Sequence, residues 1–332
     1  MNLDAQEPIL QVNKSRHVLY PIQYDDIFRK YKEASSSYWV ADEINFSQDL
    51  VDLGKLNENE KFFIHHVLAF FAASDGIVME NLGQRFMNDI PLPEAKAFYS
   101  FQLAMEQVHS EVYSLLIDTY EKDPVKKDAL FNAVTTFPAI QEKAAWALRW
   151  IEDKEAPFAQ RLLGFAIVEG LFFSASFCAI FWLRERGLLP GLSFANQLIS
   201  RDESLHTDFA CLIYSKLVNR IPADRVHAIF REAVDIEERF ITESIPCSMI
   251  GMNSELMKEY IKFIADRLLS QLGYEKIYNT RNPFQFMEFS ALDQVSNFFE
   301  TRNGAYNKAG VSLESGKSVV PDKLEVDTDG DF

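Results

Sequence analysis

The sequence contains two Glu-x-x-His pairs, Glu106 with His109 and Glu203 with His206. Residues three apart share one face of an α-helix, so each pair can place a carboxylate and an imidazole on the same metal ion. A single pair is weak support for a metal site, because most such pairs combine a solvated acid with an ordinary histidine. Two pairs in separate segments, using two of the six histidines in the chain, are a much stronger indication.

Two further acids lie in apolar surroundings. Asp75 occurs in VLAFFAASDGIV, and Glu169 occurs in LLGFAIVEGLFFSASFCAIFWL, the run from Leu162 to Leu183. Carboxylates are almost never fully buried unless they are paired or bind a metal. No lysine or arginine lies within a helical turn or two of Glu169 in its own segment. A salt bridge to another helix is the structural alternative to a role in metal binding.

The charges of these groups favour two metal ions. Four carboxylates carry four negative charges, which two divalent ions would neutralise inside the core, where unpaired carboxylates are strongly disfavoured. Carboxylates with imidazoles and no thiolate suit iron or manganese, whereas structural zinc sites favour cysteine. Ferritin-like dimetal proteins combine single acids from two helices with Glu-x-x-His from two others. The sequence therefore predicts a dinuclear site, most readily of iron, between four helices.

Tyr113 belongs to the same helical stripe. Relative to Glu106, His109 lies about 60° back around the helix and Tyr113 about 20° back. A tyrosine one turn beyond a metal-bound histidine can exchange an electron and a proton with an oxidised metal centre. The alternative is a core tyrosine with a satisfied hydroxyl group. Phe173 and Phe177 follow Glu169 at helical spacing and would give an oxidised tyrosine a dry lining.

The elements that must position these residues are helical. Gly and Pro number only 13 and 12 in 332 residues, and hydrophobic residues make up 48%, with 28 phenylalanines. This composition favours a helical fold with a large aromatic core over a turn-rich sheet. Asn57-x-x-Glu60 predicts a capping box and Pro93 a first helical position. We expect helices near 24–37, 57–87, 93–120, 124–134, 138–153, 157–186, 193–219, 222–244 and 254–272.

Charge and targeting signals exclude several classes of protein. A net charge of −16 argues against nucleic acid or anionic lipid as a partner, since both need clustered Lys and Arg. The N-terminal MNLDAQEPIL lacks the features of a signal or transit peptide, so we expect a cytoplasmic protein. Leu162–Leu183 is long enough to span a bilayer, but an acid at the bilayer centre costs roughly 2.5–3.5 kcal/mol. Since we find no second such segment, we expect a buried core helix and no membrane.

Cys178, Cys211 and Cys247 form no C-x-x-C pair, so a disulfide framework is not expected. Any thiol chemistry would have to come from a partner.

Several stretches together resemble the small, radical-generating subunit of class I ribonucleotide reductase, of the eukaryotic and viral type. The resemblance covers nearly the whole chain. It is most specific in FFAASDGIV (70–78), AMEQVHSEVYSLLIDTY (104–120), VEGLFFSASF (168–177), LISRDESLHTDFA (198–210) and the terminal Asp-Phe. It implies an all-α, ferritin-like helical bundle with additional helices around a buried dimetal-carboxylate site.

The resemblance also implies individual roles. Tyr113 would become a stable tyrosyl radical. The metal ligands would be Asp75, Glu106, His109, Glu169, Glu203 and His206, and the apolar pocket of the radical would be Phe173, Phe177 and Ile199. Trp39 would join a radical-transfer route through Asp202 to His109, and Tyr306 would relay the oxidising equivalent onward. The structural alternatives are core packing for Trp39 and loop anchoring for Tyr306.

We expect a poorly ordered arm (1–20), one ferritin-like domain (21–300) and a mobile tail (301–332). The tail is predicted because the pattern changes near residue 301 and residues 313–332 are polar, acidic and poor in large apolar side chains. The acidic tail would dock through Phe332 on a large, nucleotide-binding subunit, although a frayed terminus is the simpler explanation. The small subunit would form a homodimer. The N-terminal extension common in eukaryotic members is mostly absent, so regulation carried there is not assumed.

The predicted reaction is reduction of ribonucleoside diphosphates to deoxyribonucleoside diphosphates. The small subunit would use O₂ and two iron ions with an oxygen bridge, and manganese is the other candidate metal. The chain has no Gly-rich phosphate-binding loop, consistent with a substrate site on the partner. Two alternatives use the same ligands or fold: a dimetal oxidase or monooxygenase acting on its own substrate, and an iron-storage protein or inactive scaffold subunit.

Overall fold

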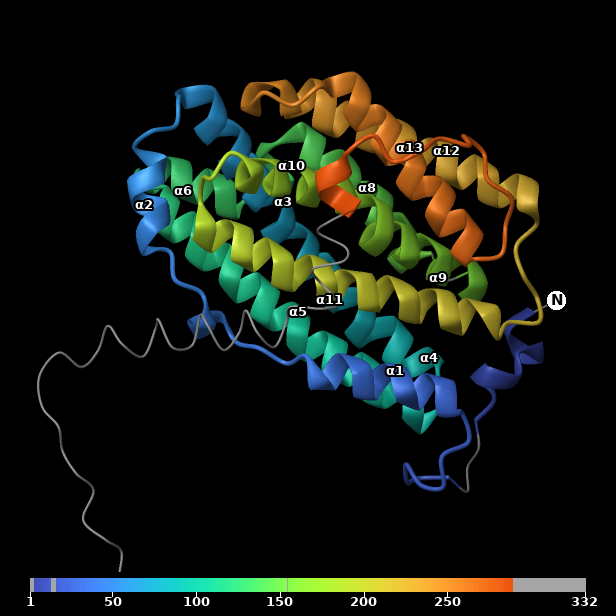
Figure 1. The fold of residues 1–332 in the computed structure, drawn as a ribbon. Coiled ribbons are helices and arrows are strands. Elements are labelled where there is room, and N and C mark those ends of the chain that lie inside the picture. Colours follow the sequence, from blue (N-terminus) through green and yellow to red (C-terminus); the bar gives the residue numbers. More distant parts are fainter. Residues whose placement is uncertain (1–2, 13–15, 154, 289–332) are drawn as a thin grey trace, which may run out of the picture.

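The computed structural model describes residues 3–12, 16–153 and 155–288, and within these ranges it is helical with no strand (Figure 1). The predicted all-α fold is therefore confirmed. The α-helices are α1 (Asp25–Ser36), α2 (Ser47–Leu53), α3 (Glu58–Asn81), α4 (Met87–Asp89), α5 (Pro93–Tyr120), α6 (Pro124–Phe131), α7 (Ala133–Thr136), α8 (Pro138–Glu152), α9 (Phe158–Ile167), α10 (Ser174–Glu185), α11 (Pro190–Ser215), α12 (Ala223–Arg239) and α13 (Ser254–Gln271). Four short 3₁₀ turns are described at Leu3–Gln6, Pro8–Leu10, Ala41–Glu43 and Cys247–Ile250.

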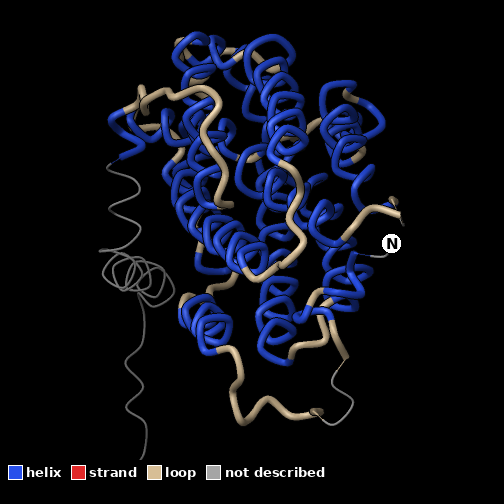
Figure 2. Tube along the Cα trace, turned by 90° about the vertical axis from the view of Figure 1, so that its right-hand side faces the viewer, coloured by secondary structure: helices blue, strands red, loops and turns tan. Residues whose placement is uncertain are grey.

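Long helices that are distant in sequence form the centre of the bundle. The helix α3 packs along α5, and α11 packs against α5, α9 and α10. The helix α1 packs against α5 and α11 on one side, while α12 and α13 cover the opposite side (Figure 1). Figure 2 shows the described residues, turned by 90°, as helices joined by loops. The result is a ferritin-like arrangement of four long helical segments with further helices around it, as the donor pattern predicted.

The starts of the central helices follow local sequence signals. Asn57 Oδ1 accepts a hydrogen bond from the Glu60 backbone N–H at 3.0 Å, and the Glu60 carboxylate accepts one from the Asn57 N–H at 2.9 Å. This capping box and the first-turn Pro93 of α5 are both confirmed. The two interactions satisfy N–H groups that have no partner inside the helix.

The start of α11 differs from the expectation. The helix begins at Pro190, not near 193, because Asp49 of α2 accepts hydrogen bonds from the N–H groups of Gly191 and Leu192, both at 2.8 Å. A proline fits the first helical position well. The helix α2, which supplies this cap, is not among the predicted helices. The capping interaction comes from a residue more than 140 positions away, so no local signal indicates it.

Three of the predicted continuous helices contain a π-helical turn, which we did not anticipate. These turns are η4 (Leu82–Phe86), η5 (Val168–Phe172) and η6 (Phe240–Ser244). A π-helical turn inserts one extra residue into a helix and occurs frequently at functional sites. Of the three, η5 carries Glu169 and separates α9 from α10.

The described part of residues 1–20, for which we expected poor order, makes buried contacts. Ile9 is buried, and Glu7 accepts hydrogen bonds from the N–H groups of Val218 and Asn219 at 2.8 and 2.6 Å. Arg16 contacts the buried Glu94 of α5 through two nitrogens at 2.9 and 2.6 Å. These partners lie far along the chain, so the arm alone did not indicate them.

Two helical stretches are long and apolar enough to cross a membrane, Glu58–Asp89 and Phe158–Glu185. The expectation of only one such segment is therefore wrong. In the more apolar stretch, Phe158–Glu185, 94% of the most hydrophobic window is buried inside the protein. Core helices pass the same test of length and composition, and Glu169 lies in this one.

Candidate metal centre

Four helical segments bring the six predicted ligands into one cluster. Asp75 comes from α3, the pair Glu106 and His109 from α5, Glu169 from η5, and the pair Glu203 and His206 from α11. All six side chains are buried, with exposed fractions of 2% or less. Since α3, α5 and α11 are regular helices of 24 to 28 residues, their spacing fixes which side chains face inward.

The carboxylates and imidazoles lie within reach of shared ions. His206 Nδ1 lies 3.0 Å from Glu106 Oε1, 3.1 Å from Glu203 Oε2 and 3.8 Å from Glu169 Oε2. His109 Nδ1 lies 3.1 Å from Glu203 Oε1 and 3.5 Å from Glu106 Oε2. Each of Glu106, Glu169, Glu203 and His206 offers one atom within 4.8 Å of the others, which is suitable for holding a metal ion.

Several polar atoms in this cluster are buried and make no well-oriented hydrogen bond, although His109 Nδ1 and Glu203 Oε1 are only 3.1 Å apart. These atoms are Asp75 Oδ2, Glu106 Oε2, His109 Nδ1, Glu169 Oε2 and Glu203 Oε1. Leaving a buried polar group unsatisfied is costly, and leaving an unpaired charge in a core is more costly still. Metal ions would satisfy all of these atoms at once. The residues present therefore fit a centre of two divalent ions bound by carboxylate oxygen and imidazole nitrogen.

The electrostatics reflect the crowding of acids. Burial raises the pKa of Asp75 well above its usual range, and the nearby Glu106 charge adds to the effect. Burial likewise raises the pKa of Glu169, together with the charges of Glu203 and Glu106. Burial alone would lower the pKa of His206, but the surrounding carboxylates raise it. A cluster of this kind favours a positive charge in its middle, which divalent ions would provide.

One polar residue near the centre was not predicted. Gln102, on α5, has its Nε2 3.4 Å from both Glu106 Oε1 and Glu169 Oε1, and it is buried. It therefore connects acids from two different helices and can orient them. Gln102 lies four residues before Glu106, on the same helical face, and this spacing could have identified it.

Asp202 connects the centre to Trp39. Its Oδ2 lies 3.2 Å from His109 Nε2 and accepts a hydrogen bond from Trp39 Nε1 at 2.7 Å. The other oxygen, Oδ1, accepts from Arg201 Nη2 at 2.8 Å. Trp39 is fully buried, with its ring stacked 5.9 Å from that of His109. The structure thus brings together the predicted His109, Asp202 and Trp39, while Arg201 is an additional partner.

Burial opposes ionisation of Asp202, but its hydrogen bond with His109 and the Arg201 charge lower its pKa. A carboxylate that orients a metal-binding imidazole also strengthens it as a ligand.

Tyr113 is buried beside the cluster. Its hydroxyl has no hydrogen-bond partner, and burial together with the charge of Asp75 raises its pKa well above the usual range. The ring that stacks on Tyr113 is Phe71, at 4.8 Å between centroids, and Phe177 stacks on Phe71 at the same distance. Phe71 was not among the predicted pocket residues, although it lies four residues before Asp75.

Two of the three predicted pocket residues, Phe173 and Phe177, contact the ring of Phe71. Phe173 meets Phe71 edge-on, with ring centroids 5.6 Å apart. Ile199 is buried on α11. The rings on this side of Tyr113 are therefore apolar, and Phe71 makes the direct ring contact.

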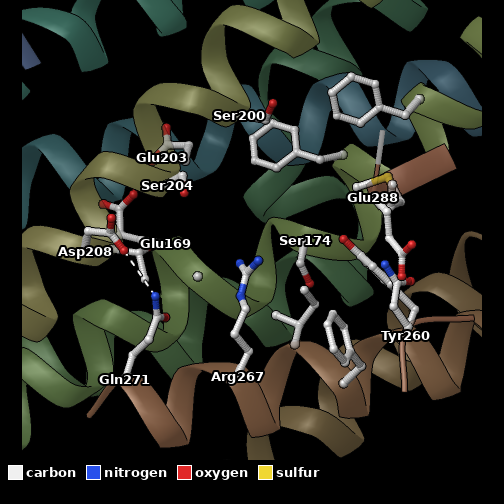
Figure 3. Close-up of a pocket in the computed structure, with 18 residues that line it drawn as sticks. Glu169, Ser174, Ser200, Glu203, Ser204, Asp208, Tyr260, Arg267, Gln271 and Glu288 are labelled. Carbon is white, nitrogen blue, oxygen red and sulfur yellow. Dashed lines mark hydrogen bonds between the residues drawn. The ribbon is translucent and has the colours of Figure 1, made fainter. Parts of the chain in front are cut away.

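A surface pocket reaches two of the cluster carboxylates. It encloses about 460 Å³, and Glu169 and Glu203 are part of its lining. Figure 3 shows both carboxylates at one end of the pocket, while Tyr260 and Arg267 extend into it from α13. Gln271 donates a hydrogen bond to Asp208 at 3.2 Å near the same end. Glu169 and Glu203 are therefore the two cluster carboxylates that line this pocket.

A comparison with known families identifies this arrangement. The family model described as "Ribonucleotide reductase, small chain" matches residues 16–283. The chain belongs to this family. Its matched region includes all six clustered side chains, Tyr113, Trp39 and Asp202.

Similarity to individual proteins supports the same family assignment. The ribonucleoside-diphosphate reductase small chain of Neurospora crassa is 55% identical over 331 residues, which cover 99% of this chain and 81% of that protein. The human ribonucleoside-diphosphate reductase subunit M2 is 54% identical over 305 residues, which cover 92% of this chain and 78% of that protein. The solved Rnr4 homodimer of Saccharomyces cerevisiae has a TM-score of 0.80 and 36% identity, covering 92% of this chain and 94% of that one.

These similarities assign the chain to ribonucleoside-diphosphate reductase, an oxidoreductase, as a small chain of that enzyme. Together with the buried cluster, they support a dimetal centre. Two predicted residues of the ribonucleotide reductase small chain, Tyr306 and Phe332, lie outside the described residues, as does the predicted tail (301–332).

Proposed function

We propose that this chain generates and stores a tyrosyl radical at Tyr113, beside two iron ions held by the six clustered side chains. The radical would be passed to a large subunit that reduces ribonucleoside diphosphates. The observation that carries the proposal is the set of buried ligand atoms without a hydrogen bond, together with the Tyr113 hydroxyl, which has none either. Contacts with His109 and His206 bring only imidazoles to the four carboxylates, with no Lys or Arg among the six clustered side chains, and the Tyr113 hydroxyl is not satisfied as in an ordinary core tyrosine.

Iron is the metal of this proposal because carboxylate and imidazole donors without thiolate suit it, and manganese is accepted by the same donors. Bound iron would supply the redox chemistry that activates O₂ and oxidises the tyrosine. The pocket lined by Glu169 and Glu203 is the proposed approach for O₂ and for metal ions. The chain itself supplies ligand geometry, exclusion of water and delivery of the electron.

The side chains around Tyr113 suit the storage of a radical. The ring lies against Phe71, and its hydroxyl is shielded from solvent and from hydrogen-bond donors. Phe173 and Phe177 extend this apolar wall and offer no atom that an oxidised tyrosine could readily abstract hydrogen from. Exclusion of water also prevents reduction of the radical by solutes.

The proposed route for the oxidising equivalent leaves through His109, Asp202 and Trp39. Hydrogen bonding connects the three side chains without a gap. In the proposal, Asp202 holds the imidazole and the indole N–H in line and can accept a proton when Trp39 loses an electron. Tyr306 would continue the route towards the partner.

We further propose that the chain acts as a homodimer and docks on the large subunit through its tail, ending at Phe332. The homodimeric state of the solved Rnr4 structure supports the first part. The peptide Val-Asp-Thr-Asp-Gly-Asp-Phe, identical to residues 326–332, should compete with the tail and inhibit the assembled enzyme. No inhibition at high peptide excess would contradict docking through the tail.

The radical itself can be tested directly. Metal-free protein is loaded with Fe(II) without oxygen, oxygen is admitted, and the electron paramagnetic resonance spectrum is recorded at low temperature. We expect about two irons per chain and a tyrosyl doublet that disappears in Tyr113→Phe. Iron uptake with no doublet in the wild-type protein would contradict radical storage, and no uptake of iron or manganese would contradict the metal centre.

Two rival functions use the same fold. A dimetal oxidase acting on its own substrate would stay active in Tyr113→Phe, whereas the proposed enzyme would not. An iron-storage protein would take up many irons per chain, and a scaffold would take up none, so elemental analysis distinguishes both from a two-iron centre.

A further inference from the structure

Lys143, on α8, is a lysine in the protein core. Its side chain is 2% exposed, and it pairs with Glu237 of α12, whose side chain is completely buried. The Lys143 Nζ lies 2.5 Å from Glu237 Oε2. Neither residue belongs to the cluster of metal ligands, to the surroundings of Tyr113 or to the route through Asp202. Lysine and glutamate are rarely buried this deeply, so the pair calls for an explanation.

The ammonium group of Lys143 contacts several elements at once. It donates a hydrogen bond to the Phe172 carbonyl at 2.7 Å. It also lies over the rings of Phe70 and Phe240, 3.7 and 3.9 Å from their centroids. These contacts join α8 and α12 to η5, to α3 and to η6. Cation–π contacts of this length favour a fixed position for the charge.

The carbonyl group that accepts the hydrogen bond from Lys143 belongs to the turn that carries Glu169. Phe172 is the last residue of the π-helical turn η5, and Glu169 lies three residues earlier in the same turn. Where a π-helical turn interrupts a regular helix, the register of the backbone hydrogen bonds changes, and carbonyl groups there need other donors. The Nζ of Lys143 provides one. The bond therefore holds the end of the turn that presents Glu169 to the centre.

The other side of η5 is also closely packed. Gly170 follows Glu169, and a Cβ atom there would lie 2.8 Å from Thr207 Cγ2 of α11 and 3.2 Å from Leu268 Cδ2 of α13. The turn is thus held between α11 and α13 on one side and Lys143 at its end. A shift of the Phe172 carbonyl would have to move the backbone that carries Glu169.

A purely stabilising role explains the pair poorly. Burial lowers the pKa of Lys143 to about 8 and raises the pKa of Glu237 to about 7, each opposed by the charge of its partner. Both charges are therefore costly to keep in the core. An apolar pair of similar volume is often as stable as a buried ion pair or more so. What an apolar pair cannot provide is a donor for the Phe172 carbonyl.

We propose that Lys143 is a positioning residue for the metal centre: it fixes the π-helical turn that carries Glu169 by donating to the Phe172 carbonyl, and Glu237 compensates the charge of the lysine. This inference rests on the proposed function, because it assigns Lys143 a role in binding the metals. Lys143 acts through the backbone and touches neither metal nor Tyr113.

The test uses the full chain in metal-free form and the variant Lys143→Met/Glu237→Leu, which removes both charges and keeps the volume. Mn²⁺ is titrated in, and free Mn²⁺ is followed by electron paramagnetic resonance. We expect Mn²⁺ affinity at one of the two sites to fall by about 10- to 100-fold, the usual effect of losing an outer contact. Amide hydrogen exchange in residues 168–173 should become faster, while urea unfolding shows that the fold is retained.

The matched control is Arg161→Met/Asp89→Asn. Arg161 lies on α9, in the same long helical stretch as Glu169, and forms an ion pair with Asp89 that does not touch the turn. This control should bind Mn²⁺ like the wild-type protein. A second variant, Glu237→Gln, removes only the counter-charge. Its lysine can still donate to the Phe172 carbonyl even when neutral, so Mn²⁺ affinity should stay within about threefold of wild type.

The outcomes separate this inference from the proposed function. Wild-type protein that binds no Mn²⁺ would contradict the metal centre itself. Wild-type binding with unchanged affinity and exchange in the Lys143→Met/Glu237→Leu variant would overturn only the role of Lys143. If that variant does not fold, Glu237→Gln decides: a loss of affinity of tenfold or more there would show that the ion pair, not the hydrogen bond, is what the centre needs.

Discussion

Asp75 and Asp49 are both buried aspartates, but they differ in the hydrogen-bond donors that the protein supplies to their carboxylates. Burial raises the pKa of each above its usual range. Asp49 has all its partners: Tyr120 donates to it from α5, and the N–H groups of Gly191 and Leu192 donate from the start of α11. By contrast, Asp75 Oδ2 has no partner and faces other acids.

The difference shows what identifies a metal ligand in this fold. Neither burial nor a raised pKa distinguishes the two aspartates, because both carry the desolvation cost of a buried carboxylate. The distinguishing property is whether the protein supplies hydrogen-bond donors to every oxygen. For Asp49 the protein does so, and this acid is structural. For Asp75 it does not, and since further acids of the cluster surround Asp75, a bound cation would compensate the charge.

The largest expected effect is at Asp75. Asp75→Asn removes a charge and a ligand from the centre but deprives no protein group of a partner. We expect affinity for the second Mn²⁺ or Fe(II) ion to fall by more than about 100-fold, above the loss typical of outer contacts. The metal-free variant should unfold at the same urea concentration as the metal-free wild type, or at a higher one. A variant that bound two ions with unchanged affinity would show that Asp75 is not a ligand.

A smaller loss is expected at Asp202, which has partners and also contacts a proposed ligand. In Asp202→Asn, the amide no longer attracts the His109 imidazole as a carboxylate does, and metal affinity should fall by about 10-fold. Turnover with the large subunit should fall further, because the link to Trp39 is altered. Steady-state reduction of a ribonucleoside diphosphate and Mn²⁺ titration measure the two effects. If turnover and Mn²⁺ affinity fell by the same factor, Asp202 would have no role in radical transfer beyond its effect on metal binding.

Asp49→Asn should lower the stability of the fold and leave metal binding unchanged, the opposite of the result expected for Asp75→Asn. The amide NH₂ group would face the donating N–H of Gly191 or Leu192, so one buried donor loses its acceptor. We expect the free energy of unfolding to fall by about 1–3 kcal/mol. The number and affinity of bound metal ions should not change. If Asp49→Asn lost a metal ion, Asp49 would not be a purely structural acid, and the contrast with the proposed ligand Asp75 would be wrong.

The smallest effect concerns a third buried acid, Glu94, which receives donors from the arm. Burial alone would raise its pKa, but hydrogen bonds from Arg16 and the Gln23 N–H lower it. Since the folded-state pKa lies below the unfolded one, the stabilisation is present above the unfolded pKa and is lost as pH falls through the folded pKa. We expect Glu94→Gln to be less stable than wild type by about 1 kcal/mol at pH 7.

This deficit of Glu94→Gln should shrink as the pH falls below about 4.5, where glutamate in an unfolded chain becomes protonated. Melting temperatures measured between pH 3 and 7 test the expectation. A deficit that stayed constant over this range would show that the charge of Glu94 does not contribute.

The sequence by itself determined the helical fold and the membership of the centre. Apolar helical periodicity, few glycines and prolines, and local caps such as Asn57 with Glu60 are properties of short segments, so they can be recognised without tertiary contacts. The Glu-x-x-His spacing fixes two ligands on one helical face for the same reason. Asp75 and Glu169 were recognised because a charge in an apolar segment must have a partner somewhere.

Only the tertiary structure decided which partners those charges have. The cap that Asp49 provides for α11, the contact of Gln102 with Glu169, and the Lys143 bond to Phe172 each join two different helical segments. The π-helical turns also had no sequence signal that we recognised. In η5 the turn is held by packing around Gly170 and by the bond from Lys143, and such contacts exist only once the bundle has formed.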